Sequence, residues 1–430
     1  MAAAAVRTVA GEPSGPPKWT MLDRYVFTRT ASSPECRTSH GVPFRISLRL
    51  SAPPATSRFY LHMPAGAADH HCRILASHRD ALLFSMYMPL SQGDERRPRL
   101  FKQDLFVYIA GGSTPTLTLL PPCTESESES ESLEEDDDDG DYDGSFESDD
   151  DYDDDDSSVE SDDAHPLAGI IQFSDLEAVG VLRNDTTGEY CVAYLCVSRC
   201  ITPGSGADMV EAQMCIYYSC QSKWVLHGLP IIYRDDNALL FTERPDHRPR
   251  VTYVSLPVEA HLFSEACMDM YRSISAVEED DEAGSSNYKL MFVDVTPWHG
   301  YYFRPPPSNG FEMNIWSLIV NHGGMMEWKH EFVIPHDELR ISDLVPSPHG
   351  PLMFPVISME EPHVAYFAVG EHGYRVKKVW LVCVDLIGRS AEYAFPYLKG
   401  EEDLLGDDAD MARKKVYCFE PFLPCDVNLF

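Results

Sequence analysis

The sequence predicts an all-β protein with a β-propeller-like architecture, interrupted by a disordered acidic insertion. Three observations support this prediction: many short strand-like runs, a loose recurrence of three- or four-strand groups, and few segments with helical periodicity. With 430 residues, 44 % of them hydrophobic, the chain can bury a sizeable core. That length fits either two or three average domains or one large domain built from repeated units.

The strand-like runs are rich in Val, Ile, Tyr, Phe and Trp and are separated by Gly, Pro, Asn and Asp. Some alternate: from Phe44 to Leu50, apolar residues point to one face and polar residues to the other. The runs are 44–50, 58–63, 81–88, 104–110, 189–197, 212–219, 250–257, 289–295, 312–320, 363–370 and 378–386. Short helices are expected only at 258–264, 337–339 and 400–411.

Groups of such runs recur along the chain without a fixed period. Residues 74–122, 179–230 and 359–397 each hold three or four runs in succession. Antiparallel meanders of this size are typical of propeller blades, and about six irregular blades of antiparallel strands would account for the structured residues. A pair of large sandwiches is the alternative.

An acidic run separates two parts of the strand-rich sequence. Between Glu125 and Asp163 lie 23 acidic residues and no Lys or Arg. The rest of the chain has 46 acidic and 34 basic residues, so its net charge is −12, compared with −35 for the whole chain. Such charge density predicts disorder, and the flanking strand-like segments indicate a loop insertion. We expect a disordered N-terminus at 1–17, the first part of a β domain at 18–123, the disordered insertion at 124–165 and the remainder of the β domain at 166–430.

Several segments resemble a known family: MLDRYVF, FRISLRLSAPPATSRFYLHMP, ILASHRDALLF, LFVYIAGGSTPTLTLLPPC and FPVISMEEPHVAYFAVGEHGYR. Together they resemble the grass-specific plant family that carries domain of unknown function 1618 (DUF1618). The resemblance implies a plant source, an architecture similar to F-box-associated propellers and no established activity. The stretch Tyr233–Phe241 departs from the family's Trp-Arg-Gly turn, and an N-terminal F-box is missing, so ligand contacts of that turn and docking to a ubiquitin ligase are not implied.

Composition restricts the compartment and the partners. No run approaches the roughly 18–20 apolar residues of a membrane span, and the N-terminus lacks a secretory apolar region. We therefore expect a soluble, intracellular protein, cytoplasmic or nuclear, whose 12 scattered cysteines are reduced and mostly buried. Without clustered Lys and Arg, neither nucleic acid nor an anionic membrane is an expected partner. We expect a monomer.

No motif predicts catalysis, a metal or a cofactor. Residues 77–80 contain the His-Arg-Asp tripeptide of a kinase loop, but position 85 is Ser rather than the metal-holding Asn, so we interpret them as a turn. His70, His71 and Cys72 point to alternating faces of an extended chain, and Cys191 and Cys196 have opposite strand parity, so neither set converges on a metal. We predict no catalytic residue, no metal ligand and no cofactor.

The best candidate for a partner-binding site is an aromatic loop. Most tryptophans lie in alternating runs, where packing between blades is their commoner use. Trp298 instead begins a segment flanked by Pro and Gly, whose composition is typical of protein-binding hot spots. The candidate residues are Trp298, His299, Tyr301, Tyr302, Phe303 and Arg304.

The acidic run is the other candidate, as a solvated loop, a capture site for a basic protein or a phosphorylation site. Five serines have an acidic residue three positions later, the pattern that acidophilic kinases recognise: Ser126, Ser128, Ser132, Ser148 and Ser157. The first functional hypothesis is thus a non-enzymatic protein-interaction module. The alternative is a small-molecule-binding or enzymatic propeller that uses a central polar funnel, for which the sequence supplies no matched acid, base and nucleophile.

Overall fold

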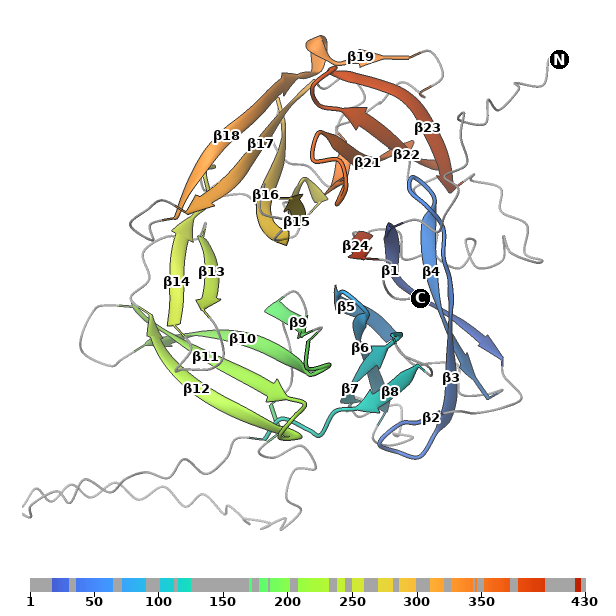
Figure 1. The fold of residues 1–430 in the computed structure, drawn as a ribbon, viewed down its shortest axis with the longest axis vertical. Helices are drawn as coiled ribbons and strands as arrows, with labels where there is room; N and C mark the ends of the chain where they lie inside the picture. The colour runs from blue at the N-terminus through green and yellow to red at the C-terminus, as the bar shows by residue number, and fades with distance from the viewer. Residues whose placement is uncertain are drawn as a thin grey trace, which may run out of the picture. The chain divides into compact units, whose positions relative to one another are not determined.

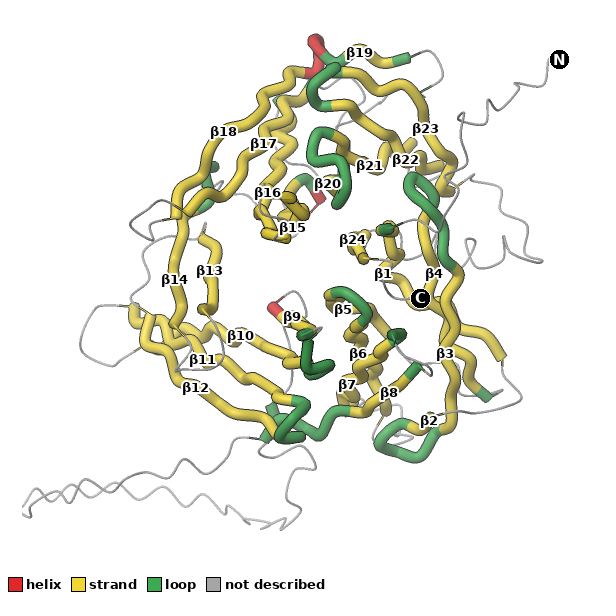
Figure 2. Tube along the Cα trace, in the orientation of Figure 1, coloured by secondary structure: helices red, strands yellow, loops and turns green. Residues whose placement is uncertain are grey.

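Strands dominate the chain in the computed structural model (Figure 2). The structure describes residues 18–30, 36–64, 72–89, 101–111, 115–124, 170–171, 178–184, 186–201, 208–231, 238–243, 250–258, 270–280, 286–298, 310–320, 326–342, 345, 352–371, 378–398 and 422–426. The chain divides into two units: the larger comprises Met1–Pro121 and Phe173–Phe430, and the smaller Pro122–Gln172.

The described strands of the larger unit form six groups, which we call blades one to six in chain order (Figure 1). The largest sheet splits into two blades because β1 and β5 share the single register pair Tyr25–Arg73. Inner strands of different blades touch: β5 contacts β9, β15 contacts β20, and β24 contacts both β5 and β20. The predicted all-β, propeller-like class is therefore confirmed.

Blade one combines strands from both ends of the chain. It consists of β1 (Trp19–Thr30), β2 (Cys36–Arg37), β3 (Pro43–Arg49), β4 (Thr56–Met63) and β24 (Phe422–Asp426). β1 lies at its centre, antiparallel to β24 on one side and parallel to β4 on the other. The last described strand thus completes the sheet that the first one starts.

Blades two and three are antiparallel meanders of consecutive strands. Blade two contains β5 (Cys72–His78), β6 (Ala81–Pro89), β7 (Phe101–Ile109) and β8 (Thr116–Leu119). Blade three contains β9 (Val179–Arg183), β10 (Tyr190–Ile201), β11 (Asp208–Tyr218) and β12 (Lys223–Ile231). These are the groups predicted at 74–122 and 179–230.

Blades four to six follow in the same way. Blade four is described as β13 (Ala238–Glu243) and β14 (Arg250–Ser255), and blade five as β15 (Arg272–Asp280), β16 (Ser286–Pro297), β17 (Phe311–Val320) and β18 (Met326–Pro335). Blade six contains β19 (Arg340–Ile341), β20 (Met353–Ile357), β21 (Val364–Glu371), β22 (Lys378–Asp385) and β23 (Ser390–Leu398). A 3-10 turn, η3 (His336–Glu338), begins one residue before the helix predicted at 337–339. Each of the eleven predicted runs overlaps a strand.

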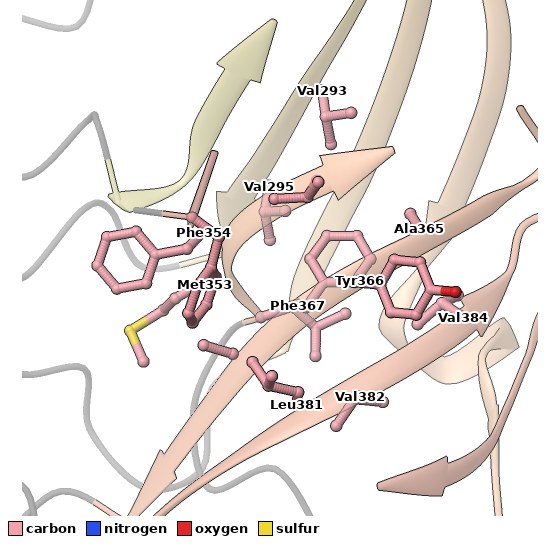
Figure 3. Close-up of a cluster of buried hydrophobic side chains, with 14 of the residues drawn as sticks. Val293, Val295, Met353, Phe354, Ala365, Tyr366, Phe367, Leu381, Val382 and Val384 are labelled. Carbon is pink, nitrogen blue, oxygen red and sulfur yellow. The ribbon is translucent and has the colours of Figure 1, made fainter. Parts of the chain in front are cut away.

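Two hydrophobic clusters fill the spaces between blades. One joins blades five, six and one, and Figure 3 shows part of it, including Val293 and Val295 of β16 and Phe354 and Phe367 of blade six. The other joins blades one and two, where Phe59 packs at 5.1 Å from Phe84, centroid to centroid. Burial of such side chains is the main favourable term in the folding free energy.

The kinase-like tripeptide lies in the turn between β5 and β6, as predicted. His78 Nδ1 accepts the backbone N–H of Arg183 at 3.0 Å, and Asp80 pairs with the Arg183 guanidinium at 3.0 Å. Arg79 has φ of 54° at the turn. These side chains therefore connect blade two to blade three.

Hydroxyl groups make similar connections elsewhere. Ser77 Oγ lies 3.3 Å from the carbonyl oxygen of Pro424, and Ser273 Oγ donates to the carbonyl of Pro355 at 2.5 Å. The first bond links blades two and one, and the second links blades five and six. Polar side chains on the inner strands therefore connect neighbouring blades by hydrogen bonds.

A polar cluster lies across the outer strands of blade five. Glu331 Oε1 accepts hydrogen bonds from Ser317 Oγ at 2.6 Å, Lys329 Nζ at 3.1 Å and Lys289 Nζ at 3.2 Å. Burial by itself raises the pKa of Glu331, but these donors outweigh it and lower the pKa from 4.5 to about 2. The carboxylate form therefore stabilises the fold at neutral pH.

In the smaller unit, the described residues are at the two ends of the acidic segment. Thr124 pairs with Ile170 as an antiparallel bridge, and the Ile171 N–H donates to the Cys123 carbonyl at 2.8 Å. The two flanks of the acidic run therefore meet. The acidic residues themselves, and the N-terminal residues 1–17, lie outside the described residues.

Candidate protein-binding surface

Trp298, the first residue of the predicted aromatic loop, follows the end of β16. Its backbone N–H donates to the carbonyl of Gly310 at 3.0 Å, so the two ends of the loop are joined before β17 begins. The indole lies against Gly310, where a Cβ would come within 2.3 Å of the ring. Even so, 55 % of Trp298 is exposed. The remaining candidates, residues 299 and 301–304, lie outside the described residues.

A histidine supports the indole from the side. The ring of His336, in η3, meets Trp298 edge-on at 6.3 Å between centroids and an interplanar angle of 86°. His336 also packs at 4.9 Å against Phe311, which is fully buried. Trp298 is therefore anchored to the core through His336 while it presents apolar area to solvent.

The turn between β22 and β23 continues the surface. Asp385 Oδ1 accepts the backbone N–H groups of Ile387 at 3.0 Å and Gly388 at 2.9 Å, which fixes the turn. Ile387 is 68 % exposed. Arg340, just after η3, donates to the carbonyl of Gly388 at 2.7 Å.

An ion pair closes the link between η3 and this turn. Arg389, two residues after Ile387, pairs with Glu338 of η3, and its carbonyl accepts the Arg340 N–H at 2.9 Å. Two exposed apolar side chains are thus connected through a charged, partly exposed bridge. We call the set Trp298, His336, Glu338, Arg340, Ile387 and Arg389 the tryptophan surface.

This surface combines exposed apolar side chains with an Arg-carboxylate ion pair. Exposed apolar groups flanked by an Arg-carboxylate pair are typical of protein interfaces, where tryptophan and arginine are enriched. Within the part of the chain that the structure describes, no three His, Cys, Asp or Glu residues lie close enough to hold a metal ion. The same described residues contain no helix long and apolar enough to cross a membrane.

The other tryptophans pack within the fold, as expected. Trp224 donates its indole N–H to the Pro121 carbonyl at 2.8 Å and packs on Tyr217. Trp316 stacks on Phe292 at 5.4 Å, and Trp328 lies 5.9 Å from the same ring. Trp298 therefore differs from these three in its exposure.

The cysteines are less buried than predicted. Among the described thiols, Cys123, Cys215 and Cys425 are buried, whereas Cys220 is exposed in the turn between β11 and β12. Desolvation raises the pKa of the half-buried Cys191 thiol, which keeps it protonated. Cys191 and Cys196, predicted as core thiols, are only partly buried, and Cys220 is exposed because a turn residue has no neighbouring sheet to cover it.

The five serines of the acidic run, candidates for phosphorylation, lie outside the described residues.

The sequence did not predict that His336, Ile387 and Arg389 form part of the surface. Their only sequence signal is the short helix predicted at 337–339 and the turn chemistry of Asp385 before Gly388. No feature of the sequence near residues 336–340 or 385–389 predicts that these two segments contact each other.

Comparison with known families and proteins gives one match. A family model described as a protein of unknown function (DUF1618) matches residues 231–366, which confirms the resemblance over that stretch. The matched region includes Trp298 and His336 and ends before the turn that carries Ile387. No curated protein matches the chain.

Proposed function

We propose that this chain, whose residues 231–366 match the DUF1618 family model, is a non-enzymatic interaction module that binds a partner protein through the tryptophan surface. One observation carries the proposal. Trp298 is held against Gly310 and His336 and still exposes 55 % of its surface. A pre-positioned indole loses little conformational freedom on binding, which favours affinity.

The use of polar groups elsewhere supports binding rather than catalysis. His78 and Asp80 on blade two both engage Arg183 of blade three. Ser77 and Ser273 likewise bond to neighbouring blades. Polar groups that make such bonds stabilise the fold. A stable fold that presents a rigid apolar surface is suited to binding a partner protein.

Site-specific crosslinking tests the proposal. A photo-crosslinking residue placed at position 298 should capture a defined protein from plant extract, identified by mass spectrometry. The same residue at position 182 is the control, since Leu182 is 52 % exposed on β9 of blade three. Identical adducts at both positions would contradict a specific surface.

Affinity measurements with the captured protein then sharpen the test. Trp298→Ala should weaken binding by about 2 kcal/mol or more, the usual effect at a hot spot, and Leu182→Ala should leave it unchanged. Gly310→Ala keeps the indole but displaces it, because the new Cβ would meet the ring at 2.3 Å. We expect this variant to bind nearly as weakly as Trp298→Ala if rigid placement matters.

The acidic run adds a second feature to the proposed module. We infer that it attracts basic proteins in the cytoplasm or nucleus by screened Coulomb forces, and that phosphorylation of its serines strengthens the attraction. Binding to core histones should weaken strongly between about 50 and 300 mM salt. Equal histone binding by the full chain and by a chain without residues 125–163 would reduce the run to a solvated loop.

A further inference from the structure

One face of blade one concentrates arginines in an otherwise acidic chain. On β3 the buried Phe44 and the core-packed Ile46 point toward blade two, so Arg45, Ser47 and Arg49 point to the opposite face. This is the alternation that the sequence predicted. Its polar face is not accounted for by the proposed function.

The neighbouring strands add further groups to the same face. Across the β3–β4 ladder, Ser47 pairs with Tyr60, Arg45 with His62, and Arg49 with Arg58. Across the parallel β1–β4 ladder, Arg29 is the register partner of His62. We call Arg29, Arg45, Ser47, Arg58, Tyr60 and His62 the arginine face.

Aromatic rings contact two of these guanidinium groups. Arg29 Cζ lies 4.2 Å from the centroid of the Tyr60 ring, and Arg58 Cζ lies 5.4 Å from that of Phe27. Among the described residues, no carboxylate lies within ion-pair distance of Arg45 or Arg58. Stacking on Phe27 holds the Arg58 guanidinium by its flat side and leaves its N–H edge available to an acceptor.

Two buried polar atoms on this face have no hydrogen-bond partner. They are the hydroxyl of Tyr60, a residue only 4 % exposed, and the Nε of Arg45. Nearby, Ser47 Oγ and His62 Nε2 are 2.7 Å apart. Buried polar groups nearly always form hydrogen bonds. The Tyr60 hydroxyl and Arg45 Nε therefore indicate that a ligand with a hydrogen-bond acceptor binds beside the stacked arginines.

We propose that the arginine face binds a phosphorylated peptide segment of a partner protein. A phosphate monoester supplies three acceptor oxygens and close to two negative charges, which suits the donors that Arg45, Arg58 and Tyr60 place on one face of β3 and β4. The face spans three strands, roughly 10 Å across, so it can also hold residues next to the phosphate. The net charge of −35 disfavours a long polyanion such as nucleic acid. This proposal is independent of the tryptophan surface.

Fluorescence anisotropy with the full chain tests the proposal. The probe is a labelled peptide with one phosphoserine, compared with its unphosphorylated twin at about 0.15 M salt. We expect the phosphorylated peptide to bind at least about tenfold more tightly. Equal binding of the twins overturns the proposal, as does stronger binding of a DNA oligonucleotide of similar length. Free O-phosphoserine that competes as well as the peptide would identify a small organic phosphate as the ligand instead.

Two conservative variants locate the site. Tyr60→Phe removes only the orphan hydroxyl, and Arg45→Lys keeps the charge but removes Nε–H; each should weaken phosphopeptide binding roughly fivefold to tenfold. Lys223→Gln, an exposed position on β12, is the charge control and should bind as the native chain does. Thermal unfolding of Tyr60→Phe should match that of the native protein. Unchanged binding by a folded Tyr60→Phe, together with unchanged binding by Arg45→Lys, overturns the site.

Discussion

Blades one and three contain similar numbers of strands but assemble them from very different parts of the chain. Blade three uses four consecutive strands between Val179 and Ile231, each paired with the next. Blade one joins β1 to β24, from the far end of the chain, and to β4 in parallel. Short connections lose less entropy on closure than long ones, so blade three forms locally and blade one only after the rest.

The difference predicts where stability is concentrated. Pairing of β1 with β24 closes a loop that contains all the other blades, and its loss would also remove the contacts of β24 with β5 of blade two and β20 of blade six. A defect inside blade three affects mainly one hairpin. The five predictions below begin with the largest expected effect.

Removal of β24 should be the most damaging change. A chain ending at residue 421 loses five register pairs with β1 and the burial of Phe422 and Cys425. We expect the melting temperature to fall by about 10 °C or more, measured by circular dichroism. A chain ending at Asp426 is the control and should melt as the full chain does. Equal melting of both truncated chains would show that closure contributes little.

Asp23 should show strong coupling to blade six. It is fully buried and accepts the Tyr397 hydroxyl at 2.5 Å and the Tyr25 N–H at 3.0 Å. Asp23→Ala should cost about 3 kcal/mol and Tyr397→Phe about 2 kcal/mol, since hydrogen bonds to charged groups are strong. Urea unfolding of the double variant should reveal a coupling of at least about 1 kcal/mol.

A matched change in blade three gives the contrast. Ser219 Oγ accepts the Tyr190 N–H at 2.8 Å across a local hairpin. Ser219→Ala should therefore cost only about 0.5–1.5 kcal/mol. A loss as large as that of Asp23→Ala would remove the distinction between the two blades.

Glu331 should make the free energy of unfolding depend on pH in the acid range. Its pKa is lowered to about 2 in the folded protein, so its contribution is present above the ordinary value of 4.5 and is lost as pH falls toward 2. At pH 7, Glu331→Gln should lower the free energy of unfolding by about 1–2 kcal/mol, and the difference should vanish near pH 2. Glu189→Gln, at an exposed turn, is the control. A difference independent of pH would rule out the ionised carboxylate as the cause.

Deletion of residues 125–163 should have the smallest effect on melting. The bridge between Thr124 and Ile170 brings the flanks together, so a short linker can replace the run. We expect the deleted and full-length chains to melt at nearly the same temperature, and a drop of more than about 8 °C, or about 2–4 kcal/mol, is the result that would contradict this. A larger drop would mean that the acidic segment packs against the fold.

Local patterns predicted the strands that alternate and the meanders that follow one another. The run from Phe44 to Leu50 predicted both a strand and its two faces, because side-chain direction has a period of two. β15 and β18 were missed because their charged residues mask any apolar alternation. β24 was missed because it is five residues long and contains a proline.

The candidate surface was predicted only in part, for a related reason. Trp298 stood out by the composition of its loop. Its link to the turn that carries Ile387 runs through η3 and Arg389 and depends on β19, a two-residue strand whose parallel pairing with β23 cannot be predicted from the sequence. Pairings between distant segments are set by the packing of whole sheets, which no single window of sequence contains.

The position of β24 also has a consequence for synthesis on the ribosome. Asp23 emerges well before its register partner Phe422, which is added 399 residues later. At about 5–20 residues per second, β1 waits roughly 20–80 s for this neighbour. During that interval it presents a strand edge that other nascent chains could pair with. Cells that make this protein should therefore need a chaperone that shields β1 until β24 has emerged.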